Sequence, residues 1–246
     1  MPHEERTYRR WPNSELCSFE VRVEESDLCI SADRMLSHLA ETALRSIRRT
    51  LEEYIQRDPA FATALEPRDP SHDAPDVVRQ MAAAARSYGV GPMAAVAGAV
   101  AQYVGQTLLS ETRQVIVENG GDIFLRSSRP RVSAIFAGAS PLSGQLGIRI
   151  SRLDQDIGLC TSSGTVGPSL SFGHADAAIV LATSAILADA AATALGNRVR
   201  KPEDIAPALE TLRGTEGILG AAAIVGDQLG AWGEIEFVPI SRSDRS

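Results

Sequence analysis

One carboxylate and one hydroxyl stand at helical spacing in an alanine-rich run of the chain. Asp189 and Thr193 lie four residues apart, so on a helix they would share one face. Hard oxygen ligands with little bulk around them suit Mg²⁺, which keeps several waters and takes further ligands from substrate phosphates. The structural alternative makes Asp189 a helix N-cap and Thr193 a packed β-branched residue. Taken alone, the spacing favours the structural alternative.

A second segment, 160–169, contains five hydroxyl residues and two glycines. Its hydroxyl and amide donors suit phosphate oxygens, although the Gly-Lys-Ser or Gly-Lys-Thr of a P-loop is missing. A serine-rich turn between two strands explains the composition equally well. Cys160 has no nearby base to activate it and is expected to be a small buried residue. The candidate ligand-binding residues here are Thr161, Ser162, Ser163, Gly164 and Thr165.

A third segment, Glu118–Asp122, joins two short apolar runs. Its Asn-Gly pair is the commonest two-residue hairpin turn, and this structural interpretation explains Asn119 and Gly120. The second glycine and the flanking acids are explained less well, because such a glycine lets a ligand approach and two carboxylates can hold a cation. Taken alone, the segment favours a turn. Its candidate ligand-binding residues are Asn119, Gly120, Gly121 and Asp122.

Composition limits the class of protein. The 246 residues include 24 Lys and Arg against 31 Asp and Glu, giving a formal net charge of −7, which argues against nucleic-acid binding. Three cysteines without a C-x-x-C pair and four scattered histidines argue against zinc and indicate a reducing compartment. The N-terminus is charged where a signal peptide needs an apolar core, and the apolar runs are interrupted. We therefore predict a cytoplasmic protein without a membrane span.

Helix and strand patterns are mixed without regular βαβ alternation, which favours an α+β fold with mixed, largely antiparallel sheets and packed helices. Length predicts one domain over 1–246, either single or as two intimately packed lobes. The four prolines of 58–75 predict an exposed connection with at most one helical turn. Helices are expected at 35–57 with Asp33 as cap, 76–87, 93–109, 186–195 with Gly196-Asn197 as C-cap, and 202–212. Strands are expected at 16–23, 28–30, 115–117, 123–125, 132–137, 147–150 and 177–182, with a terminal hairpin at 221–225 and 232–240.

In their order along the chain, namely 118–122, 160–169 and 188–194, the three segments resemble motifs of the ApbE-like family of flavin transferases, and more closely an uncharacterised sister group of ApbE-related proteins. The glycine pair of 118–122 resembles the family's Gly-Gly-Asp turn, and 161–164 resembles its Thr-Ser-Gly loop. The run 188–194 is similar to its Ala-Asp-Ala-x-Ala-Thr-Ala helix, and the small-residue helix 95–101 replaces its Gly-Gly-Ile-Ala-Lys-Gly segment. The motifs cover roughly residues 90 to 200, and the helix motif is the most specific of them.

The resemblance implies an ApbE-like, T-fold-like architecture and an enzyme that uses a divalent metal to cleave FAD. It would transfer FMN to a Thr or Ser hydroxyl of an acceptor protein. Asp189 and Thr193 would then be Mg²⁺ ligands, with the main-chain carbonyl of Ala97 as a third. The loop 161–164 would contact flavin or phosphate, and Asp122 would shape the metal or nucleotide pocket.

The sequence departs from the family pattern at two places. Gly98 stands where the family carries a lysine, and Ser171–Asp176 replaces a His-x-x-Asp-Pro-x-Thr-Gly stretch. His174 and Asp176 resemble its remnant, so His174 is expected in the pocket as a catalytic residue together with Asp189, with a strand-edge histidine as the alternative. These departures leave open a binding module that holds a flavin or phosphorylated ligand, or an enzyme acting on another small molecule. The small-residue surface of 93–109 is a candidate homodimer contact.

Overall fold

The computed structural model describes residues 15–163 and 173–240. Its large sheet has eight strands in the order β1-β2-β3-β4-β7-β8-β9-β10, and a small sheet has the order β11-β6-β5. The large sheet consists of β1 (Cys17–Val23), β2 (Ser26–Ala32), β3 (Val115–Asn119), β4 (Asp122–Arg126), β7 (Ile157–Ser162), β8 (Ala177–Ala182), β9 (Ile218–Val225) and β10 (Gln228–Gly233). The small sheet consists of β5 (Arg131–Ala134), β6 (Leu146–Ile150) and β11 (Glu236–Pro239). All neighbouring strands pair antiparallel, which confirms the predicted α+β class.

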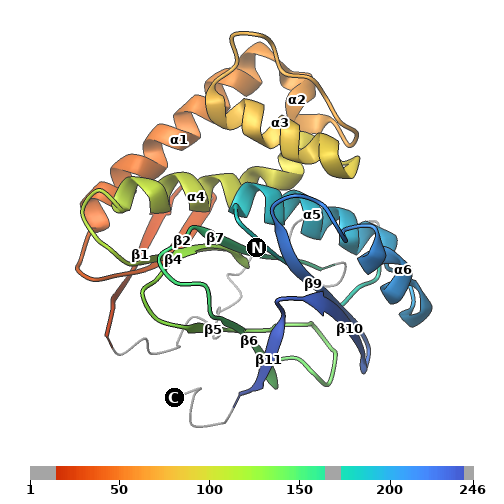
Figure 1. Cartoon of the computed structure of the whole chain (residues 1–246). Coiled ribbons are helices and arrows are strands. Elements are labelled where there is room, and N and C mark those ends of the chain that lie inside the picture. Colours follow the sequence, from red (N-terminus) through yellow and green to blue (C-terminus); the bar gives the residue numbers. More distant parts are fainter. Residues whose placement is uncertain (1–14, 164–172, 241–246) are drawn as a thin grey trace.

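The helices cover one face of the large sheet, and the small sheet covers the other (Figure 1). They are α1 (Ser37–Arg57), α2 (Pro59–Thr63), α3 (Asp76–Tyr88), α4 (Val96–Leu108), α5 (Ala185–Arg198) and α6 (Ile205–Glu210), with short 3-10 helices at Pro92–Ala95 and Pro202–Asp204. In Figure 1, α4 and α5 lie next to the sheet, while α2 and α3 lie farther out. The sheet is therefore the middle layer of the molecule.

Strand alternation supplies a core on each side of this sheet. On β4 and β7, Phe124 and Cys160 belong to the cluster under the helices. Their neighbours Leu125 and Leu159 belong to the cluster under the small sheet. Successive side chains of a strand point to opposite faces, so one strand contributes to both cores.

The helices approach one another and the sheet closely because glycines stand at the contacts. A Cβ atom at Gly98 on α4 would lie 2.2 Å from the carbonyl oxygen of Ala185, the first residue of α5. A Cβ at Gly158 on β7 would lie 2.4 Å from the Cα of the same alanine. The start of α5 is therefore fitted between α4 and β7 by two missing side chains.

Two predicted helix caps are wrong. Asp33 does not cap α1, whose N-cap is Leu36, because its carboxylate instead accepts hydrogen bonds from Thr112 and from the main chain after it. Gly196 does not end α5, which continues to Arg198. Near this helix end, the backbone at Gly173 packs directly against the Gly196 carbonyl. Only glycine fits at position 173, since a Cβ there would lie 1.8 Å from the Gly196 carbonyl oxygen.

The predicted C-terminal hairpin is right for its first strand and wrong for its second. The chain turns at Gly226 and β10 pairs with β9, but it leaves the large sheet at Gly233. This glycine has φ +75°, and a Cβ there would lie 2.3 Å from the carbonyl oxygen of Leu219. The residues beyond it form β11, which pairs with β6 in the small sheet.

The proline-rich segment 58–75 carries the short helix α2 and is anchored at its start. Phe61 is fully buried, and its ring packs edge-on against Tyr54 with the centroids 5.1 Å apart. The Tyr54 hydroxyl accepts a hydrogen bond from the Ser71 amide at 3.1 Å. Most other residues of the segment are partly or fully exposed. The segment therefore has both an anchored and an exposed part.

The small-residue surface predicted as a dimer contact is used inside the chain. Helix α4 packs against α1, α5, β3 and β4, and its glycines and most of its alanines are buried. Burial within one subunit removes the surface on which that dimer prediction depended. Within the two described stretches, no helix is both long enough and apolar enough to cross a membrane.

Candidate functional site

A cavity of about 240 Å³ opens where α5, the start of α4 and the β3–β4 turn meet the 58–75 segment. We call it the acidic pocket. Its polar side chains are Asp122, Asp189, Thr193 and Asn197. The rest of its lining is Ala62, Ala64, Leu65, Val90, Gly91, Met93, Ala94, Val96 and Ala97. The three residues predicted as metal ligands therefore meet in one cavity.

Asp189 is held by the N-terminus of a neighbouring helix. Its Oδ2 atom accepts a hydrogen bond from the Gly98 amide at 2.8 Å, and the Ala97 amide also donates to its carboxylate. The first amides of a helix have no intrahelical partner and lie at the positive end of its dipole, so they favour a carboxylate. The N-cap of α5 itself is Ser184, which rules out the alternative that Asp189 caps its own helix.

Asp122 enters the same pocket from the first position of β4. Its carboxylate accepts a hydrogen bond from the Thr161 amide and interacts with the Cys160 thiol, which also donates to the Ala185 carbonyl at 3.4 Å. Burial outweighs these interactions and raises the pKa of Asp122 to about 7. Burial, followed by the charge of Asp122, raises the pKa of Asp189 well above its usual range. Near neutral pH, two ionised carboxylates are therefore unfavourable here unless a cation accompanies them.

The remaining oxygens of the pocket fit a hard divalent cation. Thr193 follows Asp189 by one helical turn and lines the same pocket. The Ala97 carbonyl oxygen accepts a hydrogen bond from Asn119 Nδ2 at 3.1 Å, so Asn119 holds the carbonyl in place. Among the described residues, no Lys or Arg lines the pocket, and no cluster of three or more His, Cys, Asp and Glu could hold a metal. The oxygen set therefore suits Mg²⁺ with additional waters or phosphates better than zinc.

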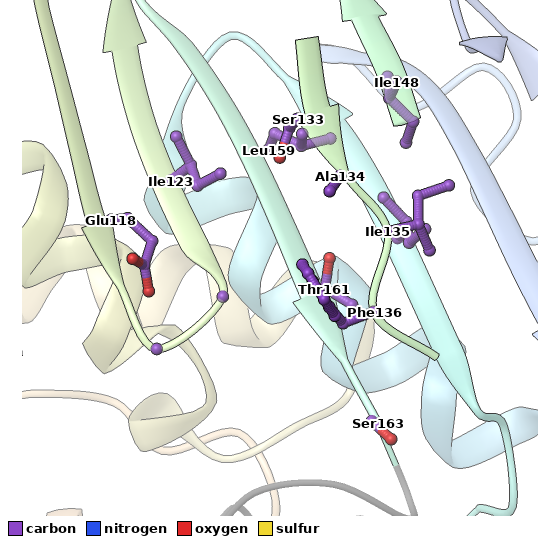
Figure 2. A pocket seen from close by; sticks show the side chains of 13 residues that line it. Glu118, Ile123, Ser133, Ala134, Ile135, Phe136, Ile148, Leu159, Thr161 and Ser163 are labelled. Atoms are coloured by element: carbon purple, nitrogen blue, oxygen red, sulfur yellow. The ribbon is translucent and has the colours of Figure 1, made fainter. Parts of the chain in front are cut away.

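A second cavity, of about 150 Å³, lies between the two sheets (Figure 2). We call it the inter-sheet pocket. Figure 2 shows side chains of both sheets gathered around it, with Thr161 and Ser163 following one another along the end of β7. Its polar side chains are Glu118, Ser133, Thr161 and Ser163. The rest of its lining is Gly120, Gly121, Ile123, Ala134, Ile135, Phe136, Ile148, Leu159 and Ile179.

The two pockets lie on opposite faces of the same strands. Asp122 lines the acidic pocket, whereas Gly121 and Ile123 on either side of it line the inter-sheet pocket. Gly120 and Gly121 have φ +68° and +114°, and a Cβ at Gly120 would meet nothing within 4 Å. Glycine is needed for this backbone conformation, and neither glycine adds a side chain at the turn between the pockets.

Other predicted site residues lie elsewhere. His174 is exposed, its amide donates to the Val199 carbonyl at 2.9 Å, and its side chain lines neither pocket. Ser162 lies near Gly196 of α5, since a Cβ built on that glycine would be 3.4 Å from its Oγ. Gly164 and Thr165 are outside the described residues. Cys160 is fully buried as predicted, and burial raises the pKa of its thiol, which does not suit a nucleophile.

Sequence reasoning missed part of the acidic pocket. The resemblance assigned Asp122 to the metal or nucleotide pocket, but its meeting with Asp189 was not predicted, because it depends on β4 and α5, which are far apart in the sequence. Asn197 was interpreted only as part of a helix end. Its position four residues after Thr193, and eight after Asp189, was a signal that the polar row continues.

The family model described as "AbpE bacteria" matches residues 9–227 of this chain. A UPF0280 protein of Methanocella arvoryzae is 42% identical over 217 residues, which cover 88% of each chain. A UPF0280 protein of Methanosphaerula palustris is 45% identical over 198 residues, covering 80% of this chain and 82% of that protein. Sequence similarity is therefore strong along nearly the whole chain.

Two solved flavin transferases share the fold at low identity. A point mutant of the flavin transferase ApbE from Vibrio cholerae has a TM-score of 0.58 and 14% identity, covering 89% of this chain and 97% of that one. The flavinyl transferase ApbE of Pseudomonas stutzeri has a TM-score of 0.53 and 14% identity, with coverages of 89% and 94%. Given the family match and the close UPF0280 relatives, the chain belongs to the AbpE family.

Proposed function

We propose that this chain binds FAD together with a divalent cation, cleaves its pyrophosphate and transfers FMN to a Thr or Ser hydroxyl of an acceptor protein. The observation that carries the proposal is the acidic pocket, where Asp122, Asp189 and Thr193 converge beside the Ala97 carbonyl. Excess carboxylate charge with no lining Lys or Arg among the described residues suits a cation. Solved proteins of the same fold are named flavin transferases, which supports the choice of reaction.

In this proposal, each residue of the acidic pocket has a separate task. Asp189 and Thr193 would hold the cation, with the Ala97 carbonyl as a third ligand. Asn119 fixes that carbonyl through its 3.1 Å hydrogen bond, and the Gly98 amide fixes the Asp189 carboxylate at 2.8 Å. A bound divalent cation would neutralise charge on the phosphate oxygens. Prior positioning of these groups reduces the reorganisation that the reaction requires.

The inter-sheet pocket supports a ligand with a flat ring. Its volume is about 150 Å³. An apolar cavity of roughly this size can hold benzene, so one end of a ring system fits. Thr161 and Ser163 place hydroxyl groups at its polar side. A nucleotide with its ring here would reach the acidic pocket by passing the turn at Gly120 and Gly121, which carry no side chains of their own. Both pockets would thus serve one dinucleotide.

In the proposed transfer, a bond forms between the acceptor hydroxyl oxygen and the phosphorus of the FMN half of FAD. The bond from that phosphorus to the bridging oxygen breaks, AMP leaves with this oxygen, and the hydroxyl proton is released. The products are AMP and a protein carrying FMN through a phosphoester bond.

The test is incubation of the purified protein with FAD, with and without Mg²⁺, and quantification of AMP by mass spectrometry. Thermal melting under the same conditions reports binding. Asp189→Asn should abolish both AMP release and the Mg²⁺-dependent shift, whereas Glu216→Gln, which changes an exposed carboxylate outside both pockets, should retain them. AMP release that is undiminished in the Asp189 variant would refute the assignment of the acidic pocket.

A binding module without catalysis is the second candidate. It is favoured by the exposed position of His174 and by the lack of a lining Lys or Arg among the described residues of the acidic pocket. It predicts a Mg²⁺-dependent thermal shift with FAD or FMN but no AMP. An enzyme acting on another phosphorylated small molecule instead predicts a shift with that ligand and none with the flavins.

A further inference from the structure

The polar side chains of α5 form one row along an otherwise buried helix. Asp189, Thr193 and Asn197 follow one another at intervals of four residues, and all three line the acidic pocket. The other positions of α5 are mostly buried alanines and larger apolar residues. From its first to its last Cα atom the row is about 12 Å long, at roughly 1.5 Å per residue. A polar row on a buried helix indicates an elongated polar ligand.

Asn197 is the member of this row that the proposed metal site leaves without a role. It is partly buried and lies in the last turn of α5, one helical turn beyond Thr193. A carboxamide has two donor hydrogens and an acceptor oxygen, so it can keep a partner within the protein and still bind a ligand. A ligand group with both donor and acceptor capacity would match it best.

The charges around the row determine which ligand group belongs at each end. Near Asp189, the amides at the start of α4 supply the positive end of a helix dipole, and the proposed cation adds positive charge. Asn197 lies in the last turn of α5, the negative end of that helix's dipole, where a hydroxyl donor is favourable; Arg198 in the same turn donates to the Ala194 carbonyl at 2.9 Å. Phosphate therefore belongs at the Asp189 end, and an uncharged hydroxyl belongs at the Asn197 end.

We infer that Asn197 is a specificity-determining residue that hydrogen-bonds a sugar hydroxyl of the phosphorylated ligand held at Asp189 and Thr193. The inference rests on the proposed function, because it requires a phosphate at the other end of the row. A ribose and a ribityl chain have this chemistry in common, namely hydroxyl groups next to a phosphate. Asn197 selects for the hydroxyls and takes no part in the bond that breaks.

The test compares the affinity for ligands with and without the hydroxyl groups, in the unchanged protein and in variants of Asn197. The affinities are measured by calorimetry in the presence of Mg²⁺. One ligand pair is ADP and 2′,3′-dideoxy-ADP, and the other is FMN and a flavin with an unsubstituted phosphoalkyl chain. The unchanged protein should bind the hydroxylated ligand of one pair about threefold to tenfold more tightly. Asn197→Ala should bind both ligands of that pair equally. Asn197→Leu, which keeps the volume, provides the same comparison if the alanine variant does not fold.

The outcomes separate the inference from the proposed function. Loss of discrimination in the ADP pair assigns the hydroxyl to ribose, and loss in the FMN pair assigns it to the ribityl chain. Equal discrimination by the unchanged protein and both variants would overturn the role of Asn197 and leave the metal site intact. No binding of any ligand to the unchanged protein would overturn both. Gln228→Ala, an exposed amide on β10, is the control and should discriminate as the unchanged protein does.

Discussion

Replacing Asp122 by asparagine should stabilise the metal-free chain at neutral and alkaline pH. The pKa of this carboxyl is about 7 in the fold against 3.8 for the ordinary group, because burial disfavours its charged form. The folded chain therefore binds more protons between these values, and its stability falls as the pH rises from about 4 to 7. A difference of roughly 3 pKa units at about 1.4 kcal/mol each gives an upper limit of about 4 kcal/mol. Asparagine retains an acceptor oxygen for the Thr161 amide and removes the ionisation.

The assay is urea unfolding, followed by circular dichroism, at pH values from about 4.5 to 8.5 in the presence of a chelator. The Asp122→Asn variant should have a flatter pH profile than the unchanged protein and a higher free energy of unfolding at pH 8. Added Mg²⁺ should stabilise the unchanged protein more than the variant, because the cation compensates the two carboxylates. Glu216→Gln controls for loss of an exposed carboxylate outside the pockets. Identical profiles for the Asp122 variant and the unchanged protein would refute the argument.

Three further substitutions test the packing, each by urea unfolding. Gly98→Ala should lower the free energy of unfolding by about 1–3 kcal/mol, because its Cβ would lie 2.2 Å from the Ala185 carbonyl oxygen; an unchanged value would contradict the close contact. Ser184→Ala removes the N-cap of α5 and should cost about 1 kcal/mol, with a smaller loss if Gln102 replaces the cap. Tyr88→Phe should be neutral or stabilising by up to about 1 kcal/mol, because the buried hydroxyl has no partner among the described residues; marked destabilisation would reveal one.

The fold class followed from local patterns in the sequence, because its elements are mostly periodic. The apolar positions of α1 repeat at helical spacing and are the residues that become buried, such as Leu44 and Ile47. Asp33 shows where local reasoning fails. It stands where a cap is expected, yet Thr112 and the residues after it, nearly 80 positions away, provide better donors for its carboxylate. A cap of this kind is decided by tertiary contacts that no short window contains.

The second limit concerns the C-terminal strands, where a continuous apolar pattern hides a change of sheet. The alternation from Trp232 to Ile240 fits one strand, but Gly233 allows the chain to bend from the large sheet into the small one. A glycine within a strand can mark a bulge, a bend or the close approach of another backbone. The sequence alone does not distinguish these cases, because it does not show which backbone lies beside the glycine. The position of the small sheet, and hence of the inter-sheet pocket, was therefore not available from the pattern.

For the candidate site, the sequence identified the α5 pair but not its surroundings. The spacing of Asp189 and Thr193 predicts a common helix face, and both residues do line one pocket. The cofactor-binding role of Asn119 stays a prediction, and the structure adds a contact that the sequence did not indicate, from its side chain to the Ala97 carbonyl. This contact depends on the distance between a turn and a helix N-terminus that lie 22 residues apart. Such distances arise from packing, which the local composition does not specify.

Close helix packing and the acidic pocket have the same structural cause. Gly98 lets α4 lie against the start of α5, and this contact brings its amide to within 2.8 Å of the Asp189 carboxylate. Burial of that carboxylate beside Asp122 costs stability, which a core built only for folding would avoid by using apolar residues. The chain retains both carboxylates on elements held rigidly by glycine and alanine contacts. This combination of rigid support with unfavourable buried charge is expected of a site that becomes favourable only when a cationic ligand is bound.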